Sequence, residues 1–123
     1  MIIHSIDRET LHLLLEMGKS SYPNEYIVAT AAEKGVINMV YPIPGSTVSN
    51  STATILLDMI PLGMSIAGTA HSHPSGLIMP SDADLSTFSS MGSVHIIVGE
   101  PFDEYSWRAF DRQGNRIKLD IVG

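Results

Sequence analysis

The stretch Ser65-Ile66-Ala67-Gly68-Thr69-Ala70-His71-Ser72-His73 is almost entirely apolar until its two histidines. Continuous apolar character is typical of a central β-strand that is covered on both faces. Pro74 and Gly76 are turn residues, and a helix is expected from Pro80 to about Met91. The stretch therefore predicts the middle strand of a sheet, followed by a turn and a helix.

The N-terminal segment predicts another helix, from Ile6 to Met17. Ser5 is a candidate N-cap, three leucines recur at the spacing of one helix face, and Gly18 stands where a helix commonly ends. These signals together favour an amphipathic helix that packs on the sheet.

Six further stretches are expected to be strands, most of them rich in β-branched and aromatic residues: 26–32, 36–41, 52–57, 94–98, 107–111 and 116–122. The first two are predicted to form a hairpin around Glu33-Lys34-Gly35, and the last two around Gln113-Gly114-Asn115. A loop is expected at 42–51. The order of elements predicts an α/β fold in which helices sandwich a curved mixed β-sheet.

The composition indicates one folded domain that spans residues 1–123. Apolar residues make up 44% and charged residues 16% of the 123 residues, which excludes a disordered chain. With no cysteine, any metal must be held by His, Asp or Glu. Apolar runs end well before the roughly 18 residues of a membrane helix, and no signal peptide is visible. We expect a cytoplasmic protein with no membrane partner.

The formal net charge is −6, from 13 acidic and 7 basic residues, and no two basic residues are adjacent. Nucleic-acid binders usually present a basic patch that neutralises phosphates. The charge therefore predicts no nucleic-acid partner. Short apolar edge strands are compatible with a homodimer.

The residues that indicate chemistry are His71, His73 and Asp84. Strand residues two apart project to the same face, so both imidazoles are expected to meet at one point. Asp84, in the first turn of the next helix, could supply a third ligand. Two His and one carboxylate, with water in the fourth position, form a known catalytic zinc pattern. Such a site also needs a base and a donor to the developing oxyanion.

Two of these signals have structural alternatives. Ser81-x-x-Asp84 also fits the capping box at a helix start, and both roles can hold together. His95, on a predicted buried strand, could support the site, although a hydrogen-bonded core histidine is the expected reading. Some of the apolar side chains of Leu77-Ile78-Met79 are expected to pack inward. Those that stay exposed could contact substrate.

The pattern His71-x-His73-Pro74-x6-Ser81-x2-Asp84 matches the JAMM signature, His-x-His-x7-Ser-x2-Asp, at every spacing. Glu25 stands where that family places a glutamate, on the strand after the first helix. Over nearly its whole length the chain resembles JAMM/MPN⁺ (JAB) zinc metalloproteases, in particular short archaeal JAMM proteins. The resemblance implies the cytidine-deaminase-like MPN/JAB fold and one zinc ion per chain.

By the same resemblance, His71, His73 and Asp84 ligate zinc, Glu25 is general base and then acid, and Ser81 stabilises the oxyanion. The implied reaction is hydrolysis of amide or isopeptide bonds at the C-terminus of ubiquitin-like or small sulfur-carrier modifier proteins, which with their conjugates are the expected partners. Isopeptide cleavage and C-terminal trimming both remain open. The alternatives are a non-catalytic MPN scaffold and a RadC-like JAB domain.

Overall fold

The computed structural model describes residues 2–43 and 59–123. Their strands form one eight-stranded sheet, in the order β7-β6-β5-β4-β2-β3-β1-β8. The elements are β1 (Ser5–Asp7), α1 (Arg8–Ser21), β2 (Ile27–Glu33), β3 (Val36–Pro42), β4 (Met64–His73), α3 (Asp82–Ser90), β5 (Val94–Gly99), β6 (Trp107–Phe110), β7 (Arg116–Ile117) and β8 (Asp120–Val122). The predicted strand at 52–57 and most of the loop expected before it lie outside the described residues.

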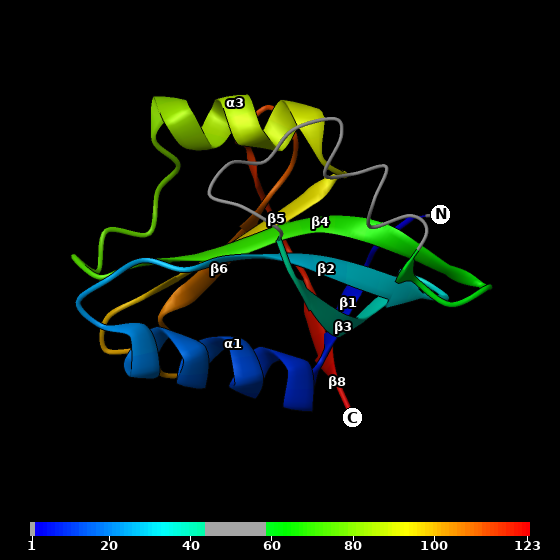
Figure 1. Ribbon diagram of the computed structural model, residues 1–123, viewed down its shortest axis with the longest axis horizontal. Helices are drawn as coiled ribbons and strands as arrows, with labels where there is room; N and C mark the ends of the chain where they lie inside the picture. Colours follow the sequence, from blue (N-terminus) through cyan, green and yellow to red (C-terminus); the bar gives the residue numbers. More distant parts are fainter. Residues whose placement is uncertain (1, 44–58) are drawn as a thin grey trace.

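The sheet is mixed, and a helix covers each of its faces (Figure 1). β4 lies inside the sheet, antiparallel to β2 and parallel to β5. α1 packs on one face and α3 lies over the other. The prediction of a central strand in a sandwiched mixed sheet is confirmed.

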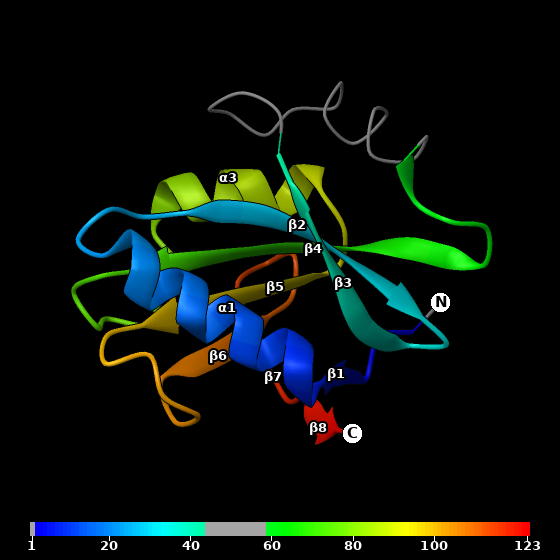
Figure 2. The same ribbon diagram turned by 60° about the horizontal axis from the view of Figure 1, so that its bottom comes forward.

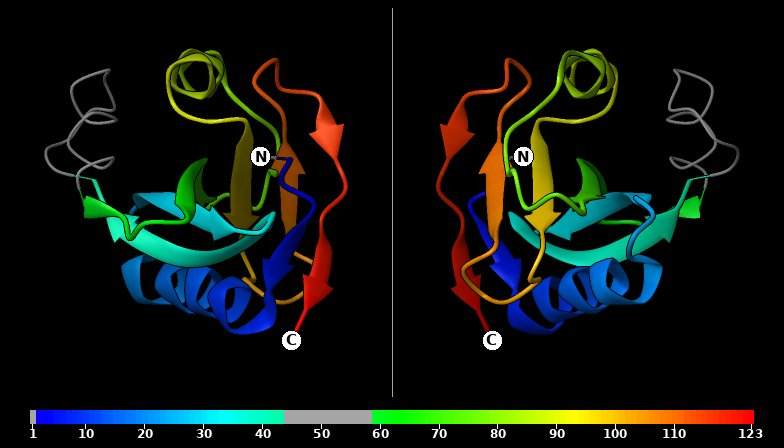
Figure 3. Two further views of the ribbon diagram at one scale, coloured as in Figure 1. Left: turned by 90° about the vertical axis from the view of Figure 1, so that its right-hand side faces the viewer. Right: turned by 90° about the vertical axis from the view of Figure 1, so that its left-hand side faces the viewer.

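The sheet curls strongly because its two edge strands are close together in the chain. β7 forms one edge and β8 the other, although only Lys118 and Leu119 separate them. Two edges joined by so short a link must approach each other, and the end-on views show this curl (Figure 3). The predicted strand 116–122 is therefore two strands, because the chain leaves β6 after Ile117 to pair in parallel with β1.

Both predicted hairpins form. β2 pairs antiparallel with β3 around Lys34 and Gly35, which both have positive φ, and β6 pairs antiparallel with β7. Figure 2 shows both pairs in the curled sheet.

The predicted start of the first helix is wrong by two residues. Residues 5–7 form β1, which pairs with β3 and β8, so α1 begins only at Arg8. Asp7, not Ser5, is the N-cap, and its carboxylate accepts a hydrogen bond from the Thr10 N–H at 3.3 Å. Strand pairing thus overrides the local capping signal of Ser5.

The predicted helix end at Gly18 is also wrong, because α1 continues to Ser21. Gly18 is buried inside the helix, and a Cβ at this position would lie 2.5 Å from a ring carbon of Phe102. The glycine therefore serves a close contact with the β5–β6 connection and does not end the helix.

The apolar core has parts on both faces of the sheet. Leu11 and Leu14 of α1 are buried against β4 and β5, in the larger cluster. On the opposite face, Phe88 of α3 packs with Ile97 and Phe110. Across residues 2–43 and 59–123, neither helix has the length and apolar character that crossing a membrane would require.

Candidate metal centre

Three possible ligands meet where β4 ends. His71 and His73 project from the last residues of β4, and Asp84 comes from the first turn of α3. The two Nε2 atoms are 3.1 Å apart, His73 Nε2 is 3.1 Å from Asp84 Oδ2, and His71 Nε2 is 3.3 Å from Asp84 Oδ1. The expected convergence of His71, His73 and Asp84 is therefore present, with their possible ligand atoms all within 4.8 Å of one another.

These separations fit a tetrahedral metal ion. Ligands bound at about 2.0–2.1 Å in tetrahedral geometry are about 3.3 Å apart, close to the three distances between these side chains. Unprotonated ring nitrogens and a carboxylate facing one another at such distances repel unless a cation or a proton lies between them. The nitrogen and oxygen donors suit zinc, and a protein site with three ligands leaves the fourth position for water.

The surroundings orient the two histidines differently. His73 Nδ1 lies 2.8 Å from the Leu77 carbonyl oxygen, which can only accept, so Nδ1 carries the proton and Nε2 faces the other ligands. His71 Nδ1 is buried and has no hydrogen-bond partner among the described residues. The His71 ring instead packs beside Phe88, with ring centroids 6.2 Å apart.

Asp84 also belongs to a helix cap, as the sequence pattern predicted. Ser81 is the N-cap of α3: its hydroxyl accepts from the Asp84 N–H at 3.1 Å, and its own N–H donates to Asp84 Oδ2 at 2.9 Å. Burial works to raise the pKa of Asp84, but hydrogen bonds from His71 and from the Ser81 N–H, with the charge of His71, hold that pKa well below its usual range. The cap thus keeps a charged carboxylate beside the two imidazoles.

Glu25 lies two residues before β2, not on the strand as expected. The register that pairs Ile27 with His71 continues toward the site, since the Ser72 N–H donates to the Tyr26 carbonyl at 3.2 Å. The buried Ser72 hydroxyl accepts from the Tyr26 N–H at 3.0 Å. Ser72 therefore holds the backbone next to Glu25, a role that the sequence analysis missed. The sequence signal for this role was a polar residue within a central strand that is covered on both faces, because a buried hydroxyl needs a hydrogen-bond partner.

The candidate catalytic residues share one cleft. A cavity of about 520 Å³ is lined by Glu25, His73, Ser81 and Asp84, and Glu25 is exposed to it. Leu77 and Met79 line the same cleft and are 63% and 58% exposed. The arrangement can present an acid–base group, a hydroxyl and a metal to one bound molecule.

His95 is a hydrogen-bonded core histidine, as expected. Its Nδ1 lies 2.7 Å from the Thr69 hydroxyl oxygen and accepts from the Thr69 N–H at 3.3 Å, while Nε2 lies 3.3 Å from the Gly92 carbonyl oxygen. Its ring stacks on Phe88, with centroids 4.2 Å apart. His95 therefore stands behind the site and is not one of the clustered ligands.

The curled mixed sheet with helices on both faces, and the His-His-Asp cluster where β4 ends, together define a JAB/MPN domain with a JAMM metalloprotease-like site. The profile of the family described as prokaryotic homologs of the JAB domain matches residues 7–113. The chain belongs to this family.

Individual relatives agree with this assignment. A Haloferax volcanii protein described as a probable metalloprotease is 37% identical over 127 aligned positions, covering 95% of this chain and 78% of that protein. A JAB1/MPN domain protein from Archaeoglobus fulgidus is 38% identical with a TM-score of 0.81, covering 97% of this chain and 99% of that one. A structure described as a JAMM metalloprotease-like zinc site in the proteasome and signalosome is 33% identical with a TM-score of 0.79, covering 98% and 99%.

Proposed function

We propose that the protein is a zinc-dependent metallopeptidase that hydrolyses amide or isopeptide bonds, with His71, His73 and Asp84 as zinc ligands. The observation that carries the proposal is the tetrahedral spacing of these ligand atoms. The cleft that brings Glu25 and Ser81 beside them adds the groups that hydrolysis needs. The description of the Haloferax volcanii relative as a probable metalloprotease supports the same class of reaction.

Each protein group has a distinct part in the reaction. When bound, zinc supplies a Lewis acid and lowers the pKa of a coordinated water. Glu25 takes a proton from the attacking water and returns it to the departing amine, which its exposed carboxylate in the cleft allows. The Ser81 hydroxyl oxygen accepts from the Asp84 N–H, and Ser81 lines the cleft beside Glu25. When its O–H turns into the cleft, it donates to the developing oxyanion.

The substrates in this proposal are small modifier proteins of the ubiquitin-like or sulfur-carrier type, attached through their C-termini. An extended C-terminal tail can enter an open cleft without unfolding of the modifier. The exposed Leu77 and Met79 offer apolar contacts to such a tail. One of the similar solved structures is described as a JAMM metalloprotease-like zinc site in the proteasome and signalosome. Two linkages are compatible with this cleft: an isopeptide bond to lysine and a peptide bond to a C-terminal extension.

Replacing Glu25 with Gln tests the proposal. The substrates are a ubiquitin-like modifier joined through its C-terminus to a lysine side chain, and the same modifier with a short C-terminal extension. Glu25→Gln should lower the turnover of the cleaved substrate by about 10²–10⁴-fold, because the base is lost. Its zinc content, measured by elemental analysis, should stay at the wild-type level.

Glu33→Gln is the matched control, because Glu33 is an exposed glutamate at the opposite end of β2. It should keep both activity and zinc. Full activity in Glu25→Gln would refute the assigned base. Zinc-loaded wild-type protein that cleaves neither substrate would favour a non-catalytic scaffold.

A further inference from the structure

The basic residues of this acidic chain are concentrated near its C-terminus. Residues 108–118 hold four of the seven bases and only one acid, Asp111, so this segment carries +3. The rest of the chain has three bases and twelve acids and carries −9. No two of these bases are adjacent in sequence, so only the folded chain can bring them together.

Strand geometry places Arg108 and Arg116 around one groove, and the link after β7 adds Lys118. Phe110 pairs with Arg116, which puts both on one face of the β6–β7 pair, and Arg108 shares that face because it lies two residues before Phe110. Lys118 follows Arg116 by two residues. All three cations line a groove of about 280 Å³. We call Arg108, Arg116 and Lys118 the basic triad.

Among the described residues, Glu104 is the one acid that lines the groove of the basic triad. The side chains of Arg108 and Arg116 have no hydrogen bond or ion pair among the described residues, and the contact of the Lys118 side chain is with Asp120 at 3.9 Å, where both side chains are well exposed. An exposed pair at this distance contributes little. Like charges gathered on one face of a strand pair are unfavourable for folding, which suggests a role in binding.

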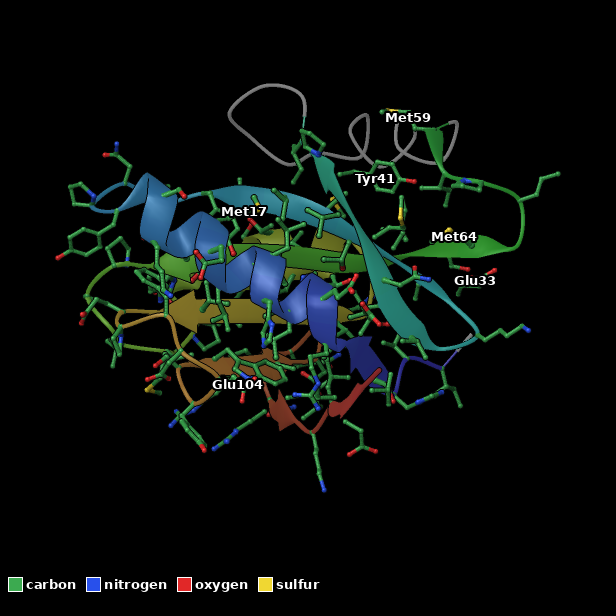
Figure 4. The ribbon with its side chains drawn as sticks, turned by 90° about the horizontal axis from the view of Figure 1, so that it is seen from below. Met17, Glu33, Tyr41, Met59, Met64 and Glu104 are labelled. Atoms are coloured by element: carbon green, nitrogen blue, oxygen red, sulfur yellow. The ribbon has the colours of Figure 1, made fainter. Side chains whose placement is uncertain are left out.

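The groove has the shape and chemistry for an extended segment. β7 pairs with β6 only at Ala109 and Phe110, and the groove runs beside the preceding Trp107–Arg108 half of β6. Tyr105, which is 93% exposed, and Trp107 supply aromatic surface to it. Glu104, labelled in Figure 4, also lines the groove, and its carboxylate lies 3.6 Å from the Arg8 guanidinium and 2.9 Å from the His12 ring of α1. Extended peptides commonly bind along such sheet edges.

We propose that the basic triad and its groove dock an extended acidic segment of a partner protein, rich in Asp or Glu. The triad supplies three positive charges over a short distance, and the two aromatic rings can pack on the backbone and side-chain stems of the segment. A long polyphosphate fits poorly, because most of it would lie against a chain whose remainder carries −9. This docking surface is independent of the proposed hydrolysis.

The test measures binding of fluorescein-labelled octaglutamate to the zinc-loaded protein by fluorescence anisotropy. At 100 mM salt, charges more than about 10 Å apart are largely screened, so the readout reports local contacts. The triple variant Arg108→Gln, Arg116→Gln, Lys118→Gln should bind at least about tenfold more weakly. The matched control, Lys19→Gln, Lys34→Gln, Arg112→Gln, undergoes the same change of charge outside the groove, leaves Arg8 beside Glu104, and should bind within about threefold of wild type.

Three results would overturn the proposal: no octaglutamate binding to wild type at millimolar concentration, equal weakening in both triple variants, or tighter binding of oligothymidine of equal charge through the same residues. Weakening in neither variant would place the peptide elsewhere, for instance at the metal centre. If the basic-triad variant does not fold, as judged by circular dichroism, the single exposed Arg108→Gln replaces it, with an expected loss of about threefold.

Discussion

His95 should make the metal-free protein lose stability as the pH falls. The imidazole is buried, and the Thr69 N–H can only donate to its Nδ1, so the ring is neutral with its proton on Nε2 toward the Gly92 carbonyl. Burial lowers the pKa of His95 to about 4, because the low-dielectric surroundings disfavour the charged ring; hydrogen bonds that the ring donates to the backbone of Gly92 and Phe88 offset this in part.

The size of this loss of stability follows from the difference in the pKa of His95 between the folded and the unfolded chain. The unfolded chain takes up a proton near the ordinary pKa of 6.5, whereas the folded chain does so near 4. Between these values the unfolded state binds more protons, so the free energy of unfolding decreases as the pH decreases. The contribution of neutral His95 to the free energy of unfolding is fully present above about pH 6.5. At pH 4.5 roughly 2–3 kcal/mol of it is lost, and the loss is nearly complete once the pH is well below 4.

Urea unfolding at pH 7.5, 6.5, 5.5 and 4.5, in the presence of a chelator, measures this loss. Carboxylates also titrate in this range, but they contribute alike to wild type and to a His95→Gln variant. Wild type should therefore lose roughly 2–3 kcal/mol more than His95→Gln between pH 7.5 and 4.5. His12→Gln, which changes an exposed histidine on α1, is the control and should follow wild type. Parallel stability curves for wild type and His95→Gln would refute the reasoning.

Two further predictions separate the helix cap from the proposed catalytic site. Asp84→Asn keeps an oxygen for the Ser81 N–H, so the stability of the metal-free protein should change by less than about 1 kcal/mol. Its zinc affinity, measured by competition with a chromophoric chelator, should fall at least about 100-fold, and unchanged affinity would remove Asp84 from the ligand set. Ser81→Ala should lower turnover by about 10²–10³-fold and stability by about 1 kcal/mol. If Ser81→Ala lowers the melting temperature but keeps full turnover, Ser81 acts only as the helix N-cap and not in catalysis.

The ligand cluster could be predicted from the sequence because its geometry is local. The alternation of a strand places His71 and His73 on one face whatever surrounds them, and the capping box ties Asp84 to Ser81 within one helical turn. Only the turn at 74–80 had to bring the two parts together. Glu25 is different, since nothing in its own neighbourhood indicates a catalytic residue; its position in the cleft depends on the pairing of β2 with β4.

The failed predictions all concern contacts between distant parts of the chain. Gly18 resembles a helix end, but Phe102, more than eighty residues later, needs the space that a side chain would fill. Ser5 resembles a cap, but pairing of β1 with β3 and β8 takes it into the sheet. The strand expected at 116–122 divides because its last residues find a partner at the other edge of the sheet.

By itself, the sequence determined the central strand, the two flanking helices and the spacing of the candidate metal ligands, because these follow from backbone periodicity over a few residues. The tertiary structure alone decided where the helix ends lie, how the sheet curls, and which charges meet. The basic triad shows the reason. Its members are isolated along a chain of net charge −6, and only the β6–β7 register and the turn away after Ile117 place them around one groove.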